Sequence, residues 1–166
     1  MDFGFTKQEL FDGGIFIMLV GPPGAGKTDY AKRFKKKYMN FEIISPDEIR
    51  KEMTGNKYDQ TYNTEVFDKV YSRISTYLSE GYNVIYDATN CRSNYRTRIL
   101  DYCSKDAKII FCIVFTTSIA TCIDRNREQN KPIPEEVIEN MWFTLKKHPP
   151  TIFEGYDAIF RNKELD

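Results

Sequence analysis

The chain has 166 residues, of which 41% are hydrophobic and 29% charged, a composition typical of one soluble globular domain that excludes extensive disorder. Its 24 lysines and arginines balance 24 aspartates and glutamates, so the formal net charge is zero. This balance disfavours a protein that coats nucleic acid through a broad basic surface. Local binding of a nucleic-acid end is still compatible with it.

The apolar runs are short, and the longest, 109–115, is far below the roughly 20 residues that span a bilayer. The acidic residues near the N-terminus do not fit a signal peptide. Four cysteines without a CxxC pair, together with a single histidine, indicate neither a structural zinc site nor a disulfide framework. We therefore expect one cytoplasmic domain, residues 1–166, that does not bind a membrane.

Strand-like runs alternate with helix-like stretches along the chain. The runs cover residues 15–20, 41–44, 83–86, 108–115 and 157–160. Most of the intervening stretches are long enough for a helical crossover, which parallel strands require. The pattern therefore predicts an α/β fold built on a doubly wound parallel sheet of five strands.

Two of the helical stretches have a clear apolar period of about 3.6 residues. The first face consists of Tyr30, Ala31, Phe34 and Tyr38, and the second of Val137, Ile138, Met141, Trp142 and Leu145. The second helix is expected to start at Pro134 and to end near His148, before two prolines. Five cations between residues 32 and 37 surround the first face and are interpreted as solvated surface.

A phosphate-binding motif follows the first strand-like run and leads into the first helix. It matches G-x-x-x-x-G-K-[ST] and consists of Gly21, Pro22, Pro23, Gly24, Ala25, Gly26, Lys27 and Thr28. Glycines let backbone N–H groups wrap the phosphates, the lysine neutralises the β- and γ-phosphates, and the hydroxyl of Thr28 ligates Mg²⁺. The motif predicts that ATP and Mg²⁺ bind here.

The acidic partner of this metal is expected at the end of a neighbouring buried strand. Asp87 follows the run 83–86 and is the candidate, although the following Ala-Thr-Asn is also good turn chemistry. Residue 88 is alanine and not the glutamate that polarises water in many ATPases. A transferase is therefore favoured over a motor.

The segment after the second strand-like run contains a candidate acceptor site. Asp47 and Arg50 are three residues apart and so share a helix face, where a carboxylate can take a hydroxyl proton and a cation can fix the acceptor. A structural interpretation is equally compatible with this segment alone. Ser45 and Glu48 form a capping-box pattern, and Pro46 suits the first helical position.

A basic segment follows the fourth strand-like run. Arg125, Arg127 and Lys131 precede two prolines, so a basic helical lid would be able to close over the triphosphate and exclude water. A solvated helix end, in which Arg125 pairs with Glu128, is the alternative.

Taken together, these motifs resemble the 5′-hydroxyl kinase module of phage and bacterial polynucleotide kinases, with the zeta-toxin-like kinases as more distant relatives. The resemblance rests on GPPGAGKT, Ser45-x-Asp47-x-x-Arg50, Asn63-x-x-Val66-Phe67, Gly81, Asp87-Ala88-Thr89-Asn90 with Arg96, Cys122-x-x-Arg125-Asn126, Pro134-x-x-Val137-Ile138 and Glu154-Gly155-Tyr156-Asp157. It implies a P-loop kinase fold that transfers phosphate from ATP to the 5′-hydroxyl end of RNA or DNA.

The resemblance also implies roles for single residues. Lys27 and Thr28 would hold the ATP phosphates and Mg²⁺, Asp47 would be the general base, and Arg50 would grip the adjoining phosphate of the acceptor. Arg125 would belong to the lid, and Asp87 would support the metal or the loop. A further set would line the acceptor groove or brace it: Thr89, Asn90 and Arg96.

Two departures from the family pattern are visible. A second lid arginine is common four residues after the first, but Gln129 stands there, and a neutral amide cannot replace a guanidinium on phosphate. Either Arg127 or Lys131 substitutes, or the lid is weaker, or the acceptor differs from that of the characterised enzymes. The phosphatase motif of many such enzymes is also missing, so this chain alone is not expected to heal 3′ ends, and separate phosphatase or ligase partners are possible. A small-molecule or nucleotide-sugar kinase, and a nucleotide-dependent binding module, are the alternative functions.

Overall fold

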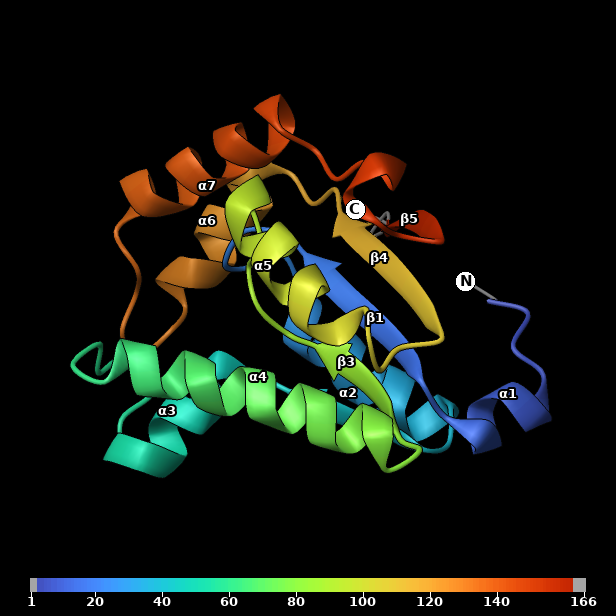
Figure 1. Ribbon diagram of the computed structural model, residues 1–166. Helices are drawn as coiled ribbons and strands as arrows, with labels where there is room; N and C mark the ends of the chain where they lie inside the picture. The colour runs from blue at the N-terminus through green and yellow to red at the C-terminus, as the bar shows by residue number, and fades with distance from the viewer. Residues whose placement is uncertain (1–2, 163–166) are drawn as a thin grey trace.

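The computed structural model describes residues 3–162 as a parallel sheet with helices on both faces (Figure 1). The strands are β1 (Ile15–Val20), β2 (Phe41–Ile44), β3 (Asn83–Tyr86), β4 (Ile109–Phe115) and β5 (Ala158–Asn162). The helices are α1 (Lys7–Asp12), α2 (Lys27–Lys37), α3 (Pro46–Thr54), α4 (Asn63–Ser79), α5 (Ser93–Cys103), α6 (Ile119–Arg127), α7 (Glu135–Lys147) and the 3₁₀ turn η1 (Ile152–Glu154).

The sheet order is β2-β3-β1-β4-β5, and every pair of neighbouring strands is parallel. The chain crosses from β1 to the edge strand β2 and returns to β3, then continues on the other side of β1. All five carboxyl ends therefore lie at one edge, and the order reverses at β1, where such folds bind ligands. The predicted α/β class and five parallel strands are confirmed.

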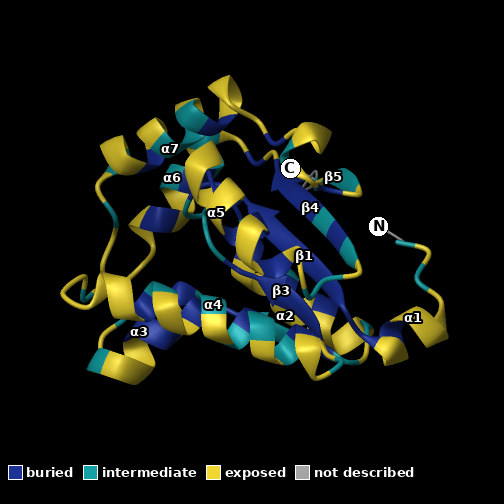
Figure 2. Cartoon of the chain, viewed as in Figure 1, coloured by how far each residue is buried: buried dark blue, intermediate teal, exposed yellow. Residues whose placement is uncertain are grey.

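The core consists of two layers because successive side chains of each strand point to opposite faces. Even-numbered residues of β1 and β3 join the cluster under α4 and α5, and odd-numbered ones join the cluster with α2. Figure 2 shows β1 and β3 fully buried between helices whose outer faces are exposed. Strands buried on both faces explain why the sequence shows continuous apolar runs.

The two predicted helix faces have different outcomes. In α2, Ala31 and Phe34 are buried and Tyr30 and Tyr38 pack against them, as expected. In α7, Ile138 and Leu145 are buried, but Val137 is exposed, so its assignment to the apolar face was wrong. The buried face of α7 is narrower than predicted, and this helix packs mainly against α6.

None of the helices between residues 3 and 162 combines the length and the apolar character that a membrane span requires. The expected domain, 1–166, includes residues 1–2 and 163–166, which lie outside the described part of the chain.

Candidate active site

The predicted phosphate loop connects β1 to α2 at the carboxyl edge of the sheet. Gly24 and Gly26 have φ of +79° and +91°, a conformation that other residues rarely adopt. A Cβ atom on Gly24 would also lie 2.4 Å from the carbonyl oxygen of Cys122 in α6. The backbone alone therefore forms the loop, and its N–H groups together with the N-terminus of α2 are suited to bind phosphate.

Neighbouring strands fix this loop from two sides. The N–H of Gly21 donates to the carbonyl oxygen of Thr89 after β3 (2.9 Å), and the hydroxyl of Thr117 after β4 donates to that of Ala25 (3.0 Å). The cradle is thus held in place by β3 and β4 before any ligand binds, which lowers the entropic cost of binding.

Lys27 is buried inside the cradle. Its ammonium donates a hydrogen bond to the carbonyl oxygen of Pro22 (2.8 Å). This loop oxygen thus takes the place that a phosphate oxygen would have beside the ammonium. Burial lowers the pKa of Lys27, and the nearby Asp87 and Asp47 carboxylates oppose this shift. A bound anion would stabilise the charged amine in the same position.

Thr28 and Asp87 meet where α2 begins and β3 ends. The Thr28 hydroxyl donates to Oδ2 of Asp87 (2.7 Å), and Asp87 is buried. Burial raises the pKa of Asp87, while the Thr28 hydrogen bond and the Lys27 charge lower it and the Asp47 charge raises it further.

This pair fits a magnesium ion. Hydroxyl and carboxylate oxygens are the ligands that Mg²⁺ prefers, and the ion takes its remaining ligands from water and phosphate rather than from a protein cage. Accordingly, residues 3–162 contain no group of three or more His, Cys, Asp or Glu side chains that would hold a metal ion.

The predicted acceptor residues lie at the start of α3, directly after β2. The Arg50 guanidinium is buried and donates to Oδ1 of Asp47 (2.7 Å) and Oδ1 of Asn63 in α4 (3.0 Å), while the Asp47 carboxylate is 68% exposed. The charge of Asp47 acts on both Lys27 and Asp87, so the structure brings the acceptor side and the phosphate side together.

The alternative interpretation of this segment is only partly correct. Pro46 does occupy the first helical position, but the Ser45 side chain accepts no capping hydrogen bond, so the expected capping box with Glu48 does not form. Arg50 does pair with Asp47, as the structural interpretation expects. The pair, however, leaves the Asp47 carboxylate exposed at the edge of the sheet where the strands end. The Nε of Arg50 is buried and has no hydrogen-bond partner among the described residues.

The predicted lid cations lie in three different environments. The Arg125 guanidinium donates to the carbonyl oxygen of Gly24 in the phosphate loop (3.2 Å). Arg127 is held by Glu135 (2.7 Å) and Asp124 (3.3 Å) on the outer side of α6. The ammonium of Lys131 lies over the ring of Tyr58, 5.6 Å from the ring centroid. Tyr58 belongs to the loop between α3 and α4.

Two of the candidate acceptor residues brace the site instead of lining it. Arg96 is fully buried, and its five N–H donors bind Glu154, Asn90, Cys91 and His148, which leaves none for a substrate. Asn90 is also buried, and its amide donates to the carbonyl oxygen of Leu19 (2.8 Å). For these two residues the contacts favour the bracing role over direct contact with an acceptor.

Thr89 stays a candidate because it is half-buried and faces a pocket of about 280 Å³ between the β3–α5 loop and α7. The walls of this pocket include Cys91, Arg92 and Tyr95 on one side and Val137 and Met141 on the other. Thr89 follows Asp87 by two residues, so this pocket lies near the carboxyl end of β3.

A comparison with protein families shows which family the chain belongs to. The model of the AAA_33 family, described as an AAA domain, matches residues 16–148. The chain belongs to this family. It is a P-loop kinase domain of the AAA_33 type, and its matched part includes the phosphate loop, Asp47, Asp87 and the lid.

Curated and solved relatives have varied functions. An L-seryl-tRNA(Sec) kinase of Methanococcus maripaludis is 27% identical over 132 residues, which are 77% of this chain and 51% of that protein. A chain of the Pnkp1/Rnl/Hen1 RNA repair complex superposes with a TM-score of 0.75 at 23% identity, covering 86% of this chain and 47% of that one. A putative kinase from Chloroflexus aurantiacus gives 0.67 at 17% identity, covering 93% and 86%.

The chain therefore spans about half the length of the curated relative, and the structural likenesses show the fold alone. Sequence reasoning named Asn63 and Glu154 only within motifs and gave them no role, although both hold a site arginine. It did not name Tyr58, because one tyrosine in a polar loop carries no signal of its contact with the lid.

We predict that Arg96→Leu destabilises the protein by about 3–5 kcal/mol, because it leaves the Glu154 carboxylate without its cation and three carbonyl oxygens without donors. The measurement is the free energy of unfolding in urea. Arg33→Leu, at an exposed position in α2, is the matched control and should change it by less than about 0.5 kcal/mol. A loss below 1 kcal/mol in Arg96→Leu would contradict the bracing role.

A second prediction concerns pH. The folded-state pKa of Asp87 lies above its ordinary value of 3.8, so the protonated carboxyl stabilises the folded protein. This stabilisation is lost as the pH rises through the folded-state pKa. Without nucleotide, the unfolding free energy of wild type minus that of Asp87→Asn should therefore fall as the pH rises from 4 upward. A difference that is constant or rises with pH would refute the assignment.

Proposed function

We propose that the chain transfers the γ-phosphoryl group of ATP to the 5′-hydroxyl at an end of RNA or DNA. The observation that carries this proposal is the exposed Asp47 carboxylate, which the buried Arg50 holds near enough to Lys27 and Asp87 for its charge to act on both. A kinase that acts on an alcohol requires such a carboxylate opposite its phosphate cradle.

In this mechanism Asp47 accepts the proton of the acceptor hydroxyl as the new oxygen–phosphorus bond forms, and the bond from the γ-phosphorus to the leaving ADP oxygen breaks. Lys27 and Arg125 neutralise the charge that develops on the transferred group. Thr28 and Asp87 hold Mg²⁺, which supplies further neutralisation of the phosphates when bound. Arg50 positions Asp47. To reach the acceptor's adjoining phosphate, its buried guanidinium would have to become accessible, because it is bound to Asn63 and to the carbonyl oxygen of Lys57.

Several comparisons support a nucleic-acid acceptor and ATP as the donor. One relative in sequence is named for a kinase of an aminoacyl-tRNA, and one structural neighbour belongs to an RNA repair complex. Another, Kti12 of Chaetomium thermophilum, is described in complex with ADP-AlF₃, at a TM-score of 0.62. If the chain repairs ends, separate phosphatase and ligase partners would complete the repair.

The seryl-tRNA kinase favours a second candidate, in which the hydroxyl belongs to an amino acid carried by tRNA. Both candidates place a primary alcohol next to Asp47 and differ in what surrounds it. A small-molecule acceptor is supported by a shikimate kinase from Acinetobacter baumannii with a TM-score of 0.58. Purified protein offered 5′-hydroxyl oligonucleotides, seryl-tRNA and small alcohols with labelled ATP separates these acceptors.

For the leading candidate, we predict that Asp47→Asn lowers kcat for labelling of 5′-hydroxyl RNA by about 10²–10⁴-fold, because the general base is lost. ATP affinity, measured by calorimetry, should stay within about twofold of wild type. Glu48→Gln, the neighbouring carboxylate, is the control and should keep its rate. Full labelling by Asp47→Asn would refute the proposed base, and retained nucleotide-dependent binding without any transfer would favour a regulatory module.

The lid gives a further prediction, because the structure separates its two candidate cations. Lys131→Ala should lower kcat by about tenfold, since the Lys131 ammonium reaches across to Tyr58 of the acceptor-side loop between α3 and α4. Arg127→Ala should change it less than twofold, because Arg127 is already occupied by Glu135 and Asp124. The reverse order of effects would show that Arg127 leaves its partners and replaces the arginine missing at Gln129.

A further inference from the structure

The outer surface of α5 carries alternating cations and aromatic rings. They recur at spacings of three and four residues, which places those within the helix on one face. All are exposed: Arg92, Tyr95, Arg98, Tyr102 and Lys105. We call this set the α5 stripe. The residues at 96, 99, 100 and 103 lie on the opposite face and are buried in the core.

One end of the α5 stripe borders the candidate active site. Arg92 and Tyr95 line the 280 Å³ pocket together with Thr89, and the Arg92 guanidinium lies 5.8 Å from the centroid of the Tyr95 ring. Because Thr89 follows Asp87 by two residues, this end of the α5 stripe lies near the carboxyl end of β3.

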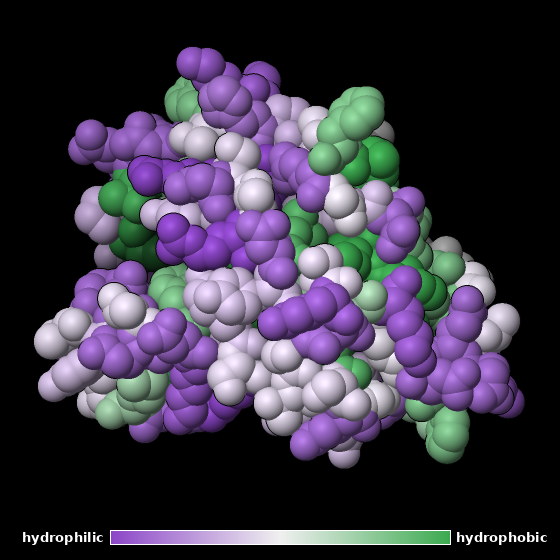
Figure 3. Space-filling view, viewed as in Figure 1, coloured by the Kyte–Doolittle hydropathy of each residue, from purple (hydrophilic) through white to green (hydrophobic). Residues whose placement is uncertain are grey.

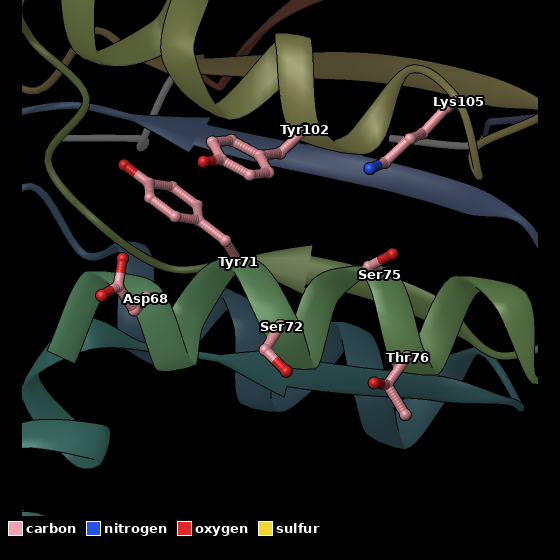
Figure 4. A pocket seen from close by; sticks show the side chains of 7 residues that line it. All are labelled: Asp68, Tyr71, Ser72, Ser75, Thr76, Tyr102 and Lys105. Carbon is pink, nitrogen blue, oxygen red and sulfur yellow. The ribbon is translucent and has the colours of Figure 1, made fainter. Parts of the chain in front are cut away.

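The other end borders a second pocket, about 400 Å³, between α4 and α5 (Figure 4). Tyr102 of α5 and Tyr71 of α4 stack face to face there, with centroids 4.1 Å apart and rings 2° from parallel. The Arg98 guanidinium reaches the phenol of Tyr71, where it opposes the rise in pKa that burial causes. Lys105 completes this end, and Asp68 is the acidic residue in its lining.

We propose that the α5 stripe binds the single-stranded nucleic acid that follows the phosphorylated end, an inference that rests on the proposed function. Within α5, residues 95–103 span about 12 Å, the length of roughly three to four stacked nucleotides. Exposed rings stack on bases of any sequence, and cations between them bind the backbone phosphates. The α5 stripe would thus prefer longer acceptors without reading their sequence.

The surface chemistry favours nucleic acid over a protein partner. In Figure 3 the surface over α4 and α5 is mainly hydrophilic or near neutral, and hydrophobic atoms gather instead around β4 and β5. A protein-binding helix face would expose aliphatic side chains in its centre. The exposed side chains of α5 are instead tyrosines, Arg98 and small polar residues, with one acidic residue, Asp101, among them.

The test compares acceptors of different length. The variant Arg98→Gln/Tyr102→Ser/Lys105→Gln removes the far end of the α5 stripe and touches no residue placed in the active site. We expect KM for a 12-nucleotide 5′-hydroxyl RNA to rise about tenfold, with kcat unchanged and KM for a dinucleotide unchanged. The slope of log KM against log salt should also decrease by about one to two.

The matched control is Lys36→Gln/Tyr82→Ser, which removes the same kinds of side chain at exposed positions in α2 and before β3. It should leave KM for both acceptors unchanged. A rise in KM that is equal for the 12-mer and the dinucleotide, or a wild-type KM independent of length, would overturn the inference.

Direct binding of a fluorescent 12-mer, measured by anisotropy without ATP, separates this inference from the proposed function. Binding that the triple variant weakens about tenfold, with no transfer to any oligonucleotide, would support the α5 stripe and refute 5′-end kinase activity. Transfer to the 12-mer with an unchanged KM in the variant would support 5′-end kinase activity and refute binding by the α5 stripe. Neither binding nor transfer would refute both.

Discussion

The hydrogen bond between Thr28 and Asp87 is the contact on which the site depends, because it joins the first turn of α2 to the end of β3. Each group alone is common at a strand or helix terminus. Together they place a hydroxyl and a buried carboxylate beside the Lys27 ammonium, and the sheet order makes this possible by setting β3 next to β1. The burial that raises the pKa of Asp87 therefore disfavours its charged form, and a bound cation would offset this cost.

Around this centre, the acceptor side and the lid are connected through loops rather than through the core. Arg50 links the start of α3 to α4 through Asn63, and Lys131 connects the lid to the loop between those helices through Tyr58. Arg125 reaches the phosphate loop from the other side. A ligand that moves either loop would therefore also move the lid residues that contact it. Acceptor binding and the exclusion of water would be coupled in this way.

Much of this was predictable from the sequence, for identifiable reasons. Buried parallel strands leave continuous apolar runs, so β1, β2 and β3 have the predicted bounds, and glycines required by backbone conformation mark the phosphate loop. The sequence could not decide the roles of Asn90 and Arg96, because it does not show whether a polar side chain beside a site points toward the ligand or into the core. The α5 stripe was not predicted for a similar reason, because only the fold shows which face of α5 is exposed.

The central claim is that an acceptor hydroxyl meets Asp47 opposite the phosphate loop. A crystal structure with ADP, Mg²⁺ and a 5′-hydroxyl oligonucleotide measures this directly as the distance from the terminal oxygen to the Asp47 carboxylate. The account predicts about 2.6–3.2 Å, the reach of a general base. A well-ordered nucleotide with the terminal hydroxyl bound elsewhere, or an Asp47 still turned only to Arg50, would contradict it.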